Sequence, residues 1–246
     1  MIEQQKVMKC SFVIPSHNSA DTLHATVESA CNQTYKDFEI IIVNDGSTDS
    51  TRDYLAWLAK QGFGDKIKVL DLEKNVGRSQ ARNLGNDHAS GDIILVLDAD
   101  DLATPNRAQL TVNKFLAGAE FVHGACYRMD AVGRSGGMMP TDVFNKDKAF
   151  RDLQNGIVHS TCAYSKELSK KYRYAEGEAA RLGLDDWQLQ TVMALGGVKF
   201  DYIPTPIAAY RLTDGAISAT RDEDAVIAYK RGFLKGFVKD EVLVNG

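Results

Sequence analysis

Two acidic stretches carry side chains that could do chemistry, because carboxylates bind cations and accept protons. Asp45, within Val43–Asp49, follows the apolar run Glu39–Val43, and Asp98-Ala99-Asp100-Asp101 follows the apolar run Asp92–Leu97. Short β-branched runs bounded by polar residues are typical of buried strands in a parallel sheet. Open α/β sheets bind ligands at the carboxyl ends of their strands. We therefore expect these acids at one sheet edge, in a site for a polar ligand and a cation.

Asp98 and Asp100 are spaced so that they could share a cation. Residues i and i+2 of an extended strand point the same way, and two close carboxylates repel unless a cation or a proton lies between them. Mg²⁺ and Mn²⁺ prefer such oxygen ligands and often share them with substrate phosphates. The alternative is a solvated acidic turn in which Asp101 caps the next helix. The position directly after an apolar strand favours the site.

Asp45 also has two interpretations. Asp-Gly is a favoured turn pair and Ser47-Thr48-Asp49 is a helix-capping sequence, so turn chemistry alone accounts for residues 46–49. Asp45 is nevertheless the acid nearest the strand end, where a carboxylate can accept hydrogen bonds from a ligand N–H. Spacing alone leaves both interpretations open.

The elements that would position these acids alternate between strand and helix up to residue 101. Apolar runs predict strands at Cys10–Ile14, Glu39–Val43, Ile67–Leu70 and Ile93–Leu97. Helices are expected from Ser19 to Thr34, from Ser47 or Thr48 to near Gly62 and Gly64, and from Ser79 to Ala89. This alternation is typical of a doubly wound, mostly parallel sheet with helices on both faces.

The second half of the chain is less regular. Its patterns predict a helix from Pro105 to Leu116, strands at Phe121–Met129 and Val158–Tyr164, a helix at Asp185–Leu195, and two strands, Val198–Ile203 and Ile207–Arg211, divided by Pro204-Thr205-Pro206. Residues 140–157 show no clear pattern. From Asp222 a last helix is expected, with Val226, Phe233, Phe237 and Val238 on one side and with Lys230, Lys235 and Lys239 exposed.

Composition narrows the class of protein. The 246 residues are 44% hydrophobic and 25% charged, as in an ordinary soluble globular protein, and the net charge of −4 offers no broad attraction for nucleic acid. There is no apolar run of about 18 residues, and Met1–Lys6 lacks the apolar core of a secretory signal. The four scattered cysteines argue against disulfides and a zinc site. We expect a cytoplasmic protein.

The polar segments, taken together, resemble the signature of glycosyltransferase family 2. They occur in that family's order and spacing and cover most of residues 11–110: Phe12–Asn18, Ser29–Gln33, Glu39–Asp49, Asn75–Asn83 and Asp98–Asp101. Gly183–Leu189 looks like the family's acidic motif before a helix, and Ile203–Ser218 is similar to its C-terminal strand and loop. The resemblance implies a single GT-A domain over residues 1–246. Its parts would be a nucleotide-sugar half (about 8–110), an acceptor half (about 111–220) and a C-terminal amphipathic helix (about 221–246).

By position, the resemblance implies a donor-binding set. Pro15 and His17 would border the nucleoside, with Ser16 and Asn18 in the same segment, and Asp45 would hold the base, usually uracil. Asp98 would approach the ribose or metal-linked waters, and Asp100, beyond Ala99, would bind the Mn²⁺ or Mg²⁺ that bridges the diphosphate. The segment that frames the nucleotide carries Gly77, Arg78 and Arg82. Arg82 is equally plausible as the structural partner of a helix end.

The resemblance also implies a catalytic acid pair. Asp186 would be the general base for the attacking hydroxyl, and Asp185 would orient Asp186 or the acceptor. One base and one displacement predict inversion at the anomeric carbon. The alternative is that both acids cap the helix, where negative charge is favoured.

Trp187, His159 and Arg211 are candidates for acceptor contacts. For Trp187 the alternative is core packing, and for His159 it is a structural place inside the fold. The chain departs from the family pattern at His17, where tyrosine or phenylalanine is frequent, and at Thr213, where histidine is frequent. Thr213 puts a metal or phosphate contact from the C-terminal loop in doubt.

The expected function is transfer of a sugar from a nucleotide donor, UDP-linked, to a hydroxyl of a cell-surface glycan, a lipid-linked saccharide or a protein glycan. One alternative is a non-catalytic nucleotide-sugar-binding subunit. A second, a sugar nucleotidyltransferase, should carry a Gly- and Arg-rich phosphate loop after the first strand, and Pro15–Asn18 is no such loop. The last helix could dock on the domain, mediate homo-oligomers, or touch the inner face of a membrane. Docking is the default.

Overall fold

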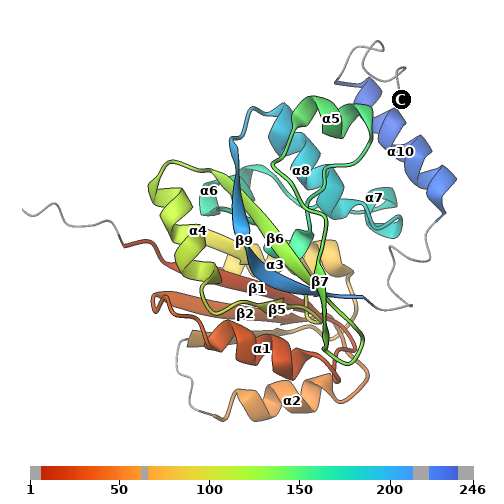
Figure 1. The fold of residues 1–246 in the computed structure, drawn as a ribbon. Coiled ribbons are helices and arrows are strands. Elements are labelled where there is room, and N and C mark those ends of the chain that lie inside the picture. Colours follow the sequence, from red (N-terminus) through yellow and green to blue (C-terminus); the bar gives the residue numbers. More distant parts are fainter. Residues whose placement is uncertain (1–6, 62–65, 213–221, 238–246) are drawn as a thin grey trace, which may run out of the picture.

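A mixed sheet forms the centre of the molecule (Figure 1). The computed structural model describes residues 7–61, 66–212 and 222–237. Within these ranges the sheet has nine strands in the order β3-β2-β1-β4-β8-β6-β9-β5, with β7 paired to β6. The strands β1 (Cys10–Ser16), β2 (Phe38–Asn44), β3 (Ile67–Asp71) and β4 (Ile93–Val96) run parallel to one another, as the alternating pattern predicted.

The other half of the sheet mixes directions. β8 (Ala163–Ser165) is antiparallel to both β4 and β6 (Phe121–Met129), and β6 is parallel to β9 (Phe200–Arg211). The short strands β5 (Leu102–Ala103) and β7 (Ser135–Met138) were not predicted.

The prediction of two strands divided by Pro204 is wrong, because β9 is continuous. Its pairing shifts register opposite β6: Gly124 faces Ile203, whereas Cys126 faces Ala208. The extra residues of β9 bulge out of the pairing, and prolines, which lack a backbone N–H, are tolerated at such a bulge.

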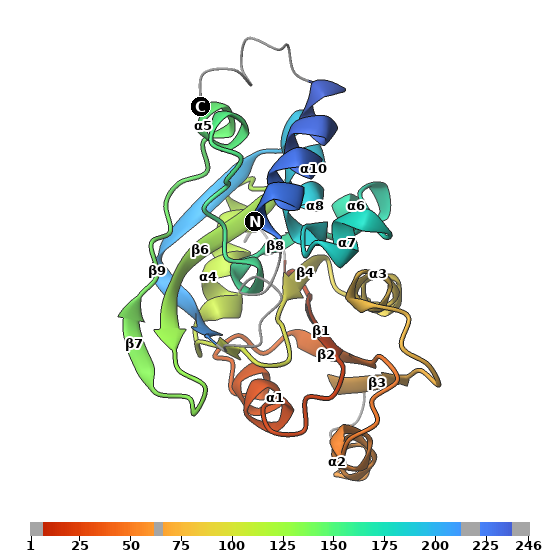
Figure 2. The same ribbon diagram turned by 90° about the vertical axis from the view of Figure 1, so that its right-hand side faces the viewer.

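Helices cover both faces of the sheet (Figure 2). α1 (Leu23–Cys31), α2 (Thr51–Leu58) and α4 (Arg107–Leu116) bury apolar side chains against one face, together with Phe12 and Ile14 of β1. α3 (Arg78–His88), α6 (Lys166–Lys171) and α8 (Asp185–Leu195) pack on the opposite face with Val13. Successive strand residues point to opposite faces, which explains why the strands are apolar on both sides. The predicted α/β architecture is confirmed.

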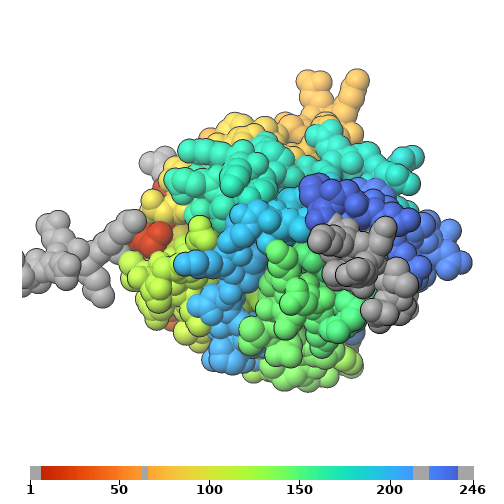
Figure 3. Space-filling view, turned by 90° about the horizontal axis from the view of Figure 1, so that it is seen from above, coloured from red at the N-terminus to blue at the C-terminus, as the bar shows by residue number. Residues whose placement is uncertain are grey.

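A third apolar cluster joins the C-terminal helix to the rest. Trp187 of α8 packs with α5 (Lys146–Arg151) and α10 (Glu223–Lys235), and Figure 3 shows α10 lying across the surface beside them. α10 therefore docks, as the default expectation stated. The expectation that Lys230 is exposed is wrong, since only 7% of it is accessible. Val238, Lys239, Gly62 and Gly64 lie outside the described residues.

Several element boundaries differ from the prediction, since α1 ends at Cys31 and α2 and α4 begin a few residues later than expected, at Thr51 and Arg107. α1 begins at Leu23 rather than Ser19, because the Ser19 carbonyl accepts hydrogen bonds from the N–H groups of Thr22 and Leu23 in a preceding turn. Residues 158–164, predicted as a strand, contain the 3₁₀ turn η2 (His159–Thr161) before β8. The short helix α7 (Glu178–Arg181) precedes α8.

None of the helices within the described ranges is long and apolar enough to cross a membrane.

Candidate functional site

A cleft of about 1080 Å³ opens at the carboxyl edge of β1, β2 and β4. All residues predicted for the site line this cleft, with the exception of Gly77. The lining residues that were predicted are Pro15, Ser16, His17, Asn18, Asp45, Arg78, Arg82, Asp98, Ala99, Asp100, His159, Asp185, Asp186, Trp187 and Arg211. Segments separated by up to about two hundred positions thus meet in one cavity. The strand ends supply one side, and α3, α8 and α10 supply the other.

Asp45, at the end of β2, holds the loop that precedes α3. Its Oδ1 accepts a hydrogen bond from the Val76 N–H at 2.6 Å, and its Oδ2 accepts one from the Gly77 N–H at 3.0 Å. Gly77 does not line the cleft itself, but its N–H helps to orient the carboxylate of Asp45, which does. The turn interpretation and the ligand interpretation of Asp45 are compatible, since each carboxylate oxygen has two lone pairs.

The segment after β1 is fastened to the loop after β2. The Nδ1 of His17 lies 2.7 Å from the carbonyl oxygen of Asp45, and because a carbonyl only accepts, Nδ1 carries a hydrogen, which in a neutral ring leaves Nε2 as an acceptor. Asn18, with φ of +50°, accepts the Thr48 N–H at 2.8 Å. Ser16 Oγ is buried and has no hydrogen-bond partner within the described part of the chain.

An ion-pair network ties the strand end at Asp98 to α8. Arg82, only 5% exposed, donates from Nη2 to Asp98 Oδ1 at 2.5 Å and from Nη1 to Asp185 Oδ2 at 2.8 Å. Arg78 donates from Nε and Nη2 to Asp185 Oδ1 at 2.9 and 2.5 Å. Asp185 is fully buried. Arg82 is thus the partner of a helix end, as the structural alternative stated.

The charges in this network set the protonation of its acids. Burial by itself raises the pKa of Asp98 and of Asp185, but the neighbouring guanidinium groups outweigh it, so both pKa values are lowered. Asp100 is different: burial and then the negative charge of Asp98 raise its pKa. Asp101, buried near both acids, has its pKa raised well above the ordinary value. The acidic turn is therefore a place where an added cation is favoured.

The donor set at this turn fits a hard divalent cation. No cluster of three or more His, Cys, Asp or Glu side chains suited to a metal exists among residues 7–61, 66–212 and 222–237. Asp98 and Asp100 could provide two carboxylates, and the remaining ligands would come from water and a substrate. Mg²⁺ sites with one or two carboxylates plus substrate phosphates have this composition.

Asp186 has different surroundings from Asp185, although both begin α8. It is half-buried, and its Oδ1 accepts the Trp187 N–H at 2.7 Å, a contact that orients the carboxylate. Asp185 instead has both oxygens on arginines of α3. Both acids thus lie in the first turn of α8, after Leu184 at the N-cap, and both line the cleft, but Asp185 is fully buried whereas Asp186 is partly exposed.

The three candidates for acceptor contacts line the cleft, and each also holds structure together. Trp187 is buried, with its ring 6.0 Å from Phe233 and under the Lys230 ammonium at 5.2 Å. Arg211 donates from its backbone N–H to Asp101 Oδ1 at 2.8 Å and from Nε to the Asp100 carbonyl at 2.8 Å, so it positions the acidic turn.

His159 is enclosed by polar partners. Its Nε2 lies 3.0 Å from the Tyr174 hydroxyl, and its Nδ1 accepts from Gln190 Nε2 at 3.4 Å. Burial, followed by the charge of Arg82, lowers its pKa and keeps the ring neutral. These contacts support a structural place for His159 inside the fold, which was the alternative to an acceptor contact.

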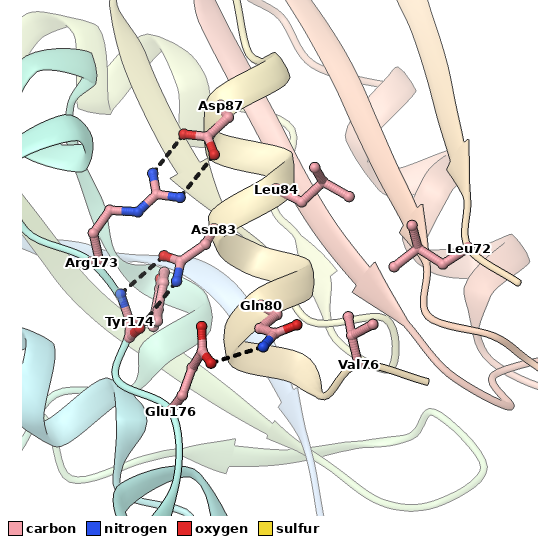
Figure 4. A pocket seen from close by; sticks show the side chains of 9 residues that line it. All are labelled: Leu72, Val76, Gln80, Asn83, Leu84, Asp87, Arg173, Tyr174 and Glu176. Atoms are coloured by element: carbon pink, nitrogen blue, oxygen red, sulfur yellow. Dashed lines mark hydrogen bonds and ion pairs between the residues drawn. The ribbon is translucent and has the colours of Figure 1, made fainter. Parts of the chain in front are cut away.

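The side of α3 away from the cleft is fastened as well. A second pocket of about 600 Å³ lies there (Figure 4). Arg173 pairs with Asp87 at 2.6 and 2.8 Å, and Gln80 donates to Glu176 at 2.8 Å. Its polar groups are paired with one another, which holds α3 in place behind Arg78 and Arg82.

Sequence reasoning missed part of the lining. Met139, Pro140, Lys230 and residues 154–158 also face the cleft. Lys230 has no local signal, because its place depends on how α10 docks. Thr213, whose departure from the family pattern raised doubt, lies outside the described residues.

Comparisons with known proteins identify the family to which the chain belongs. Residues 11–173 match the sequence model of a family described as "Glycosyl transferase family 2". An uncharacterised glycosyltransferase of Nostoc sp. is 30% identical over 89% of this chain and 70% of its own length. The succinoglycan biosynthesis protein ExoO of Rhizobium meliloti is 29% identical over 96% of this chain and 70% of its own. The chain covers much less of other relatives, such as 18% of an uncharacterised glycosyltransferase of Rickettsia bellii.

Solved structures share the fold. S. aureus TarS in complex with UDP-GlcNAc aligns over 95% of this chain and 69% of its own, with a TM-score of 0.68 at 19% identity. The mannosyltransferase PcManGT of Pyrobaculum calidifontis, in complex with GDP-Man and Mn²⁺, aligns over 86% and 59%, with a TM-score of 0.64 at 18% identity. At these identities the likeness concerns the fold. The matched residues and the relatives together show that the chain belongs to glycosyl transferase family 2.

Proposed function

We propose that this family 2 glycosyltransferase is a metal-dependent, inverting enzyme. It would move a sugar from a nucleotide diphosphate donor, UDP-linked, to a hydroxyl acceptor of a cell-envelope glycan or a lipid-linked saccharide. One observation carries the proposal: the acidic turn Asp98–Asp100 and the half-buried carboxylate of Asp186 line the same cleft from opposite elements. That arrangement suits a reaction in which one end stabilises a leaving diphosphate and the other accepts a proton.

The donor end follows from the strand ends. The nucleoside would lie along residues 15–18, where the exposed ring of His17 offers a surface for stacking and an acceptor at Nε2. Asp45 is already placed by two backbone N–H groups and can accept one more hydrogen bond from the N–H of a uracil ring. UDP as the nucleotide is an inference from this carboxylate and from the family.

The diphosphate would lie against Asp98 and Asp100. Mn²⁺ or Mg²⁺ held there would stabilise the negative charge that grows on the leaving diphosphate. Arg82 keeps Asp98 ionised and fixes its orientation, and Arg211 fixes the turn through the Asp100 carbonyl and the Asp101 carboxylate. These residues therefore hold the acidic turn in place before a donor binds.

Asp186 would take the proton of the attacking hydroxyl. A general base must lie within about 2.6–3.2 Å of the oxygen that it deprotonates, so the acceptor would bind against the N-terminus of α8. Attack from the Asp186 side, with departure toward Asp100, inverts the anomeric carbon. Asp185 holds the start of α8 against α3 and so positions Asp186.

The class of acceptor is inferred from relatives. One relative is ExoO, a succinoglycan biosynthesis protein. Another is WfgD of Escherichia coli, a β-1,3-glucosyltransferase whose name includes an α-D-GlcNAc-diphosphoundecaprenol acceptor. WfgD is 32% identical over 43% of this chain. We propose an acceptor of that general kind, a glycan or lipid-linked sugar of the cell envelope.

A thermal-shift screen tests the donor half of the proposal. Ligands that bind the native state raise its stability by mass action, so UDP-sugars with Mn²⁺ should raise the melting temperature more than GDP-sugars or UDP-sugars with EDTA. UDP release in the presence of candidate acceptors then measures turnover. If no nucleotide-sugar shifts the transition of the folded protein, the proposal is wrong.

Asp100→Asn tests the metal within that screen. The variant keeps the size of the side chain but removes a negative charge, so UDP affinity should lose its dependence on Mn²⁺ and fall at least tenfold at saturating metal. Glu167→Gln, a change on the distant α6, is the matched control and should titrate like the wild type. An unaltered Mn²⁺ titration in Asp100→Asn would remove Asp100 from the metal site.

A further inference from the structure

Residues 153–158, here named the acceptor loop, form one wall of the cleft near α8. Gln154 through Val158 line the cavity directly. At the start of the loop Leu153 has φ of +55°, a left-handed conformation that residues with a Cβ adopt rarely. A strained backbone conformation of this kind persists only where the surrounding structure holds it. The contacts made by Leu153 therefore show which residues determine the conformation of the loop.

Lys230 of α10 makes the contact at Leu153. Its ammonium donates to the Leu153 carbonyl oxygen at 2.8 Å and lies 5.2 Å from the centre of the Trp187 ring. Only 7% of Lys230 is exposed. A hydrogen bond from a charged donor is stronger than one between neutral groups, and this one acts on the carbonyl of the residue that has the unusual φ.

α8 fastens the middle of the same loop. The side-chain amide of Asn155 donates to Gln190 Oε1, and Asn155 Oδ1 in turn accepts the Ile157 N–H at 3.2 Å. Gln190 also reaches His159, just beyond the loop. α10 is itself tied to α8, since the Tyr229 hydroxyl donates to Gln188 Oε1 at 2.6 Å. The loop, α8 and α10 are thus one connected unit.

We infer that Lys230 is a positioning residue that sets the shape of the acceptor loop, and that α10 thereby takes part in acceptor selection. This inference rests on the proposed function in one respect, the identification of this wall with the acceptor. The donor wall is built from β1, β2 and α3 without any contribution of α10. The loop wall adjoins Trp187 and hence Asp186, the side from which the acceptor hydroxyl would attack. α10 therefore contributes to the wall of the cleft in addition to packing on the domain.

Hydrogen exchange followed by mass spectrometry tests the structural part in the full chain. Lys230→Met keeps the aliphatic stem on Trp187 and removes the ammonium, so amides in peptides spanning 152–162 should exchange at least tenfold faster than in the wild type. Peptides of β1 and α3 should be unchanged. Lys230→Arg retains a charged donor and should restore most of the protection. Lys235→Met, an exposed lysine on the same helix, is the matched control and should have no effect.

Hydrolysis of UDP-glucose and UDP-GlcNAc by the same variants tests the functional part, with water as the acceptor. An ordered acceptor loop excludes water, so Lys230→Met should raise the rate of UDP release at least threefold while the Kd for UDP stays within twofold. A merely structural role would lower activity instead.

The outcomes separate the two proposals. Unchanged exchange at 152–162, or faster exchange across the whole protein, overturns the role of Lys230. A loosened loop with equal or lower hydrolysis overturns its role in acceptor selection. If wild-type protein binds neither UDP-sugar, the proposed function fails, while the exchange result still decides whether Lys230 holds the loop.

Discussion

Two adjacent carboxylates at the start of α8, those of Asp185 and Asp186, differ in burial and in their ion pairs. Asp185 is fully buried, and its oxygens are taken by Arg78 and Arg82, which lower its pKa against the effect of burial. Asp186 is half-buried and faces the cleft. A sequence motif with two acids therefore contains one positioning residue and one candidate base.

Substituting each acid by its amide should separate these roles. Asp186→Asn should lower kcat by about 10²–10⁴-fold, the usual contribution of a general base, and leave the Kd for UDP within twofold. Asp185→Asn breaks a buried ion pair and should lower the free energy of unfolding by about 3 kcal/mol or more. Urea denaturation and steady-state kinetics measure both. Asp186 would lose its assignment if its amide variant were as unstable as that of Asp185 and also failed to bind UDP.

At the scale of elements, close approach of two loops brings together the segments that we propose bind the nucleotide. The loop after β2 meets the loop before α3 at Gly46, whose φ is +63°. A Cβ at Gly46 would lie 2.4 Å from the backbone nitrogen of Asn75 and from the carbonyl carbon of Lys74. Asp45, one residue earlier, makes its hydrogen bonds to the Val76 and Gly77 N–H groups across this contact. Glycine is thus required here by both conformation and space.

Gly46→Ala should push these two loops apart. The positive φ alone costs about 1–2 kcal/mol for a residue with a Cβ, and the backbone clash adds to that. Gly118→Ala is the matched control, because Gly118 has φ of +97° and no atom of the described residues lies within 4 Å of the added Cβ. Gly46→Ala should therefore be the less stable variant by urea denaturation and should also bind UDP more weakly. Equal loss of stability in the two variants would show that the loops do not crowd position 46.

At the scale of the whole molecule, the sheet joins a parallel half to a mixed half, and β6 lies within the mixed half. His123 of β6 is fully buried, with its ring 5.2 Å from Tyr202. Burial outweighs the attraction of Asp201 and Asp142 and lowers the pKa of His123 to about 4. In the unfolded chain the pKa of histidine is about 6.5. The folded protein therefore keeps this ring neutral at pH values where the unfolded chain protonates it.

This difference predicts how stability depends on pH. Between about pH 6.5 and 4 the unfolded state binds the extra proton, so His123 makes the free energy of unfolding fall as pH falls through that window, by up to about 3 kcal/mol. Above pH 6.5 its contribution is constant. His123→Phe should reduce the slope of unfolding free energy against pH in this window only. The same slope in wild type and variant would contradict a buried neutral His123.

Much of the fold could be predicted from local patterns. β1 to β4 and α8 occur close to where the apolar runs and the helical periodicity placed them, because a strand buried on both faces or a helix with one apolar side leaves a signal within a few residues. η2 and the continuous β9 could not be predicted. Their conformations depend on partners far along the chain, the Tyr174 and Gln190 contacts of His159 and the register with β6.

The sequence by itself determined the family, the α/β order and the acids at the ends of β2 and β4, because these depend on residue types at short spacing. Only the tertiary structure decided which acid of Asp185 and Asp186 is paired, what Arg82 and Arg211 hold, and that Lys230 enters the cleft wall. Ion pairs and buried hydrogen bonds join residues about one hundred positions apart. Their partners are set by how the elements pack, and no local pattern encodes that packing.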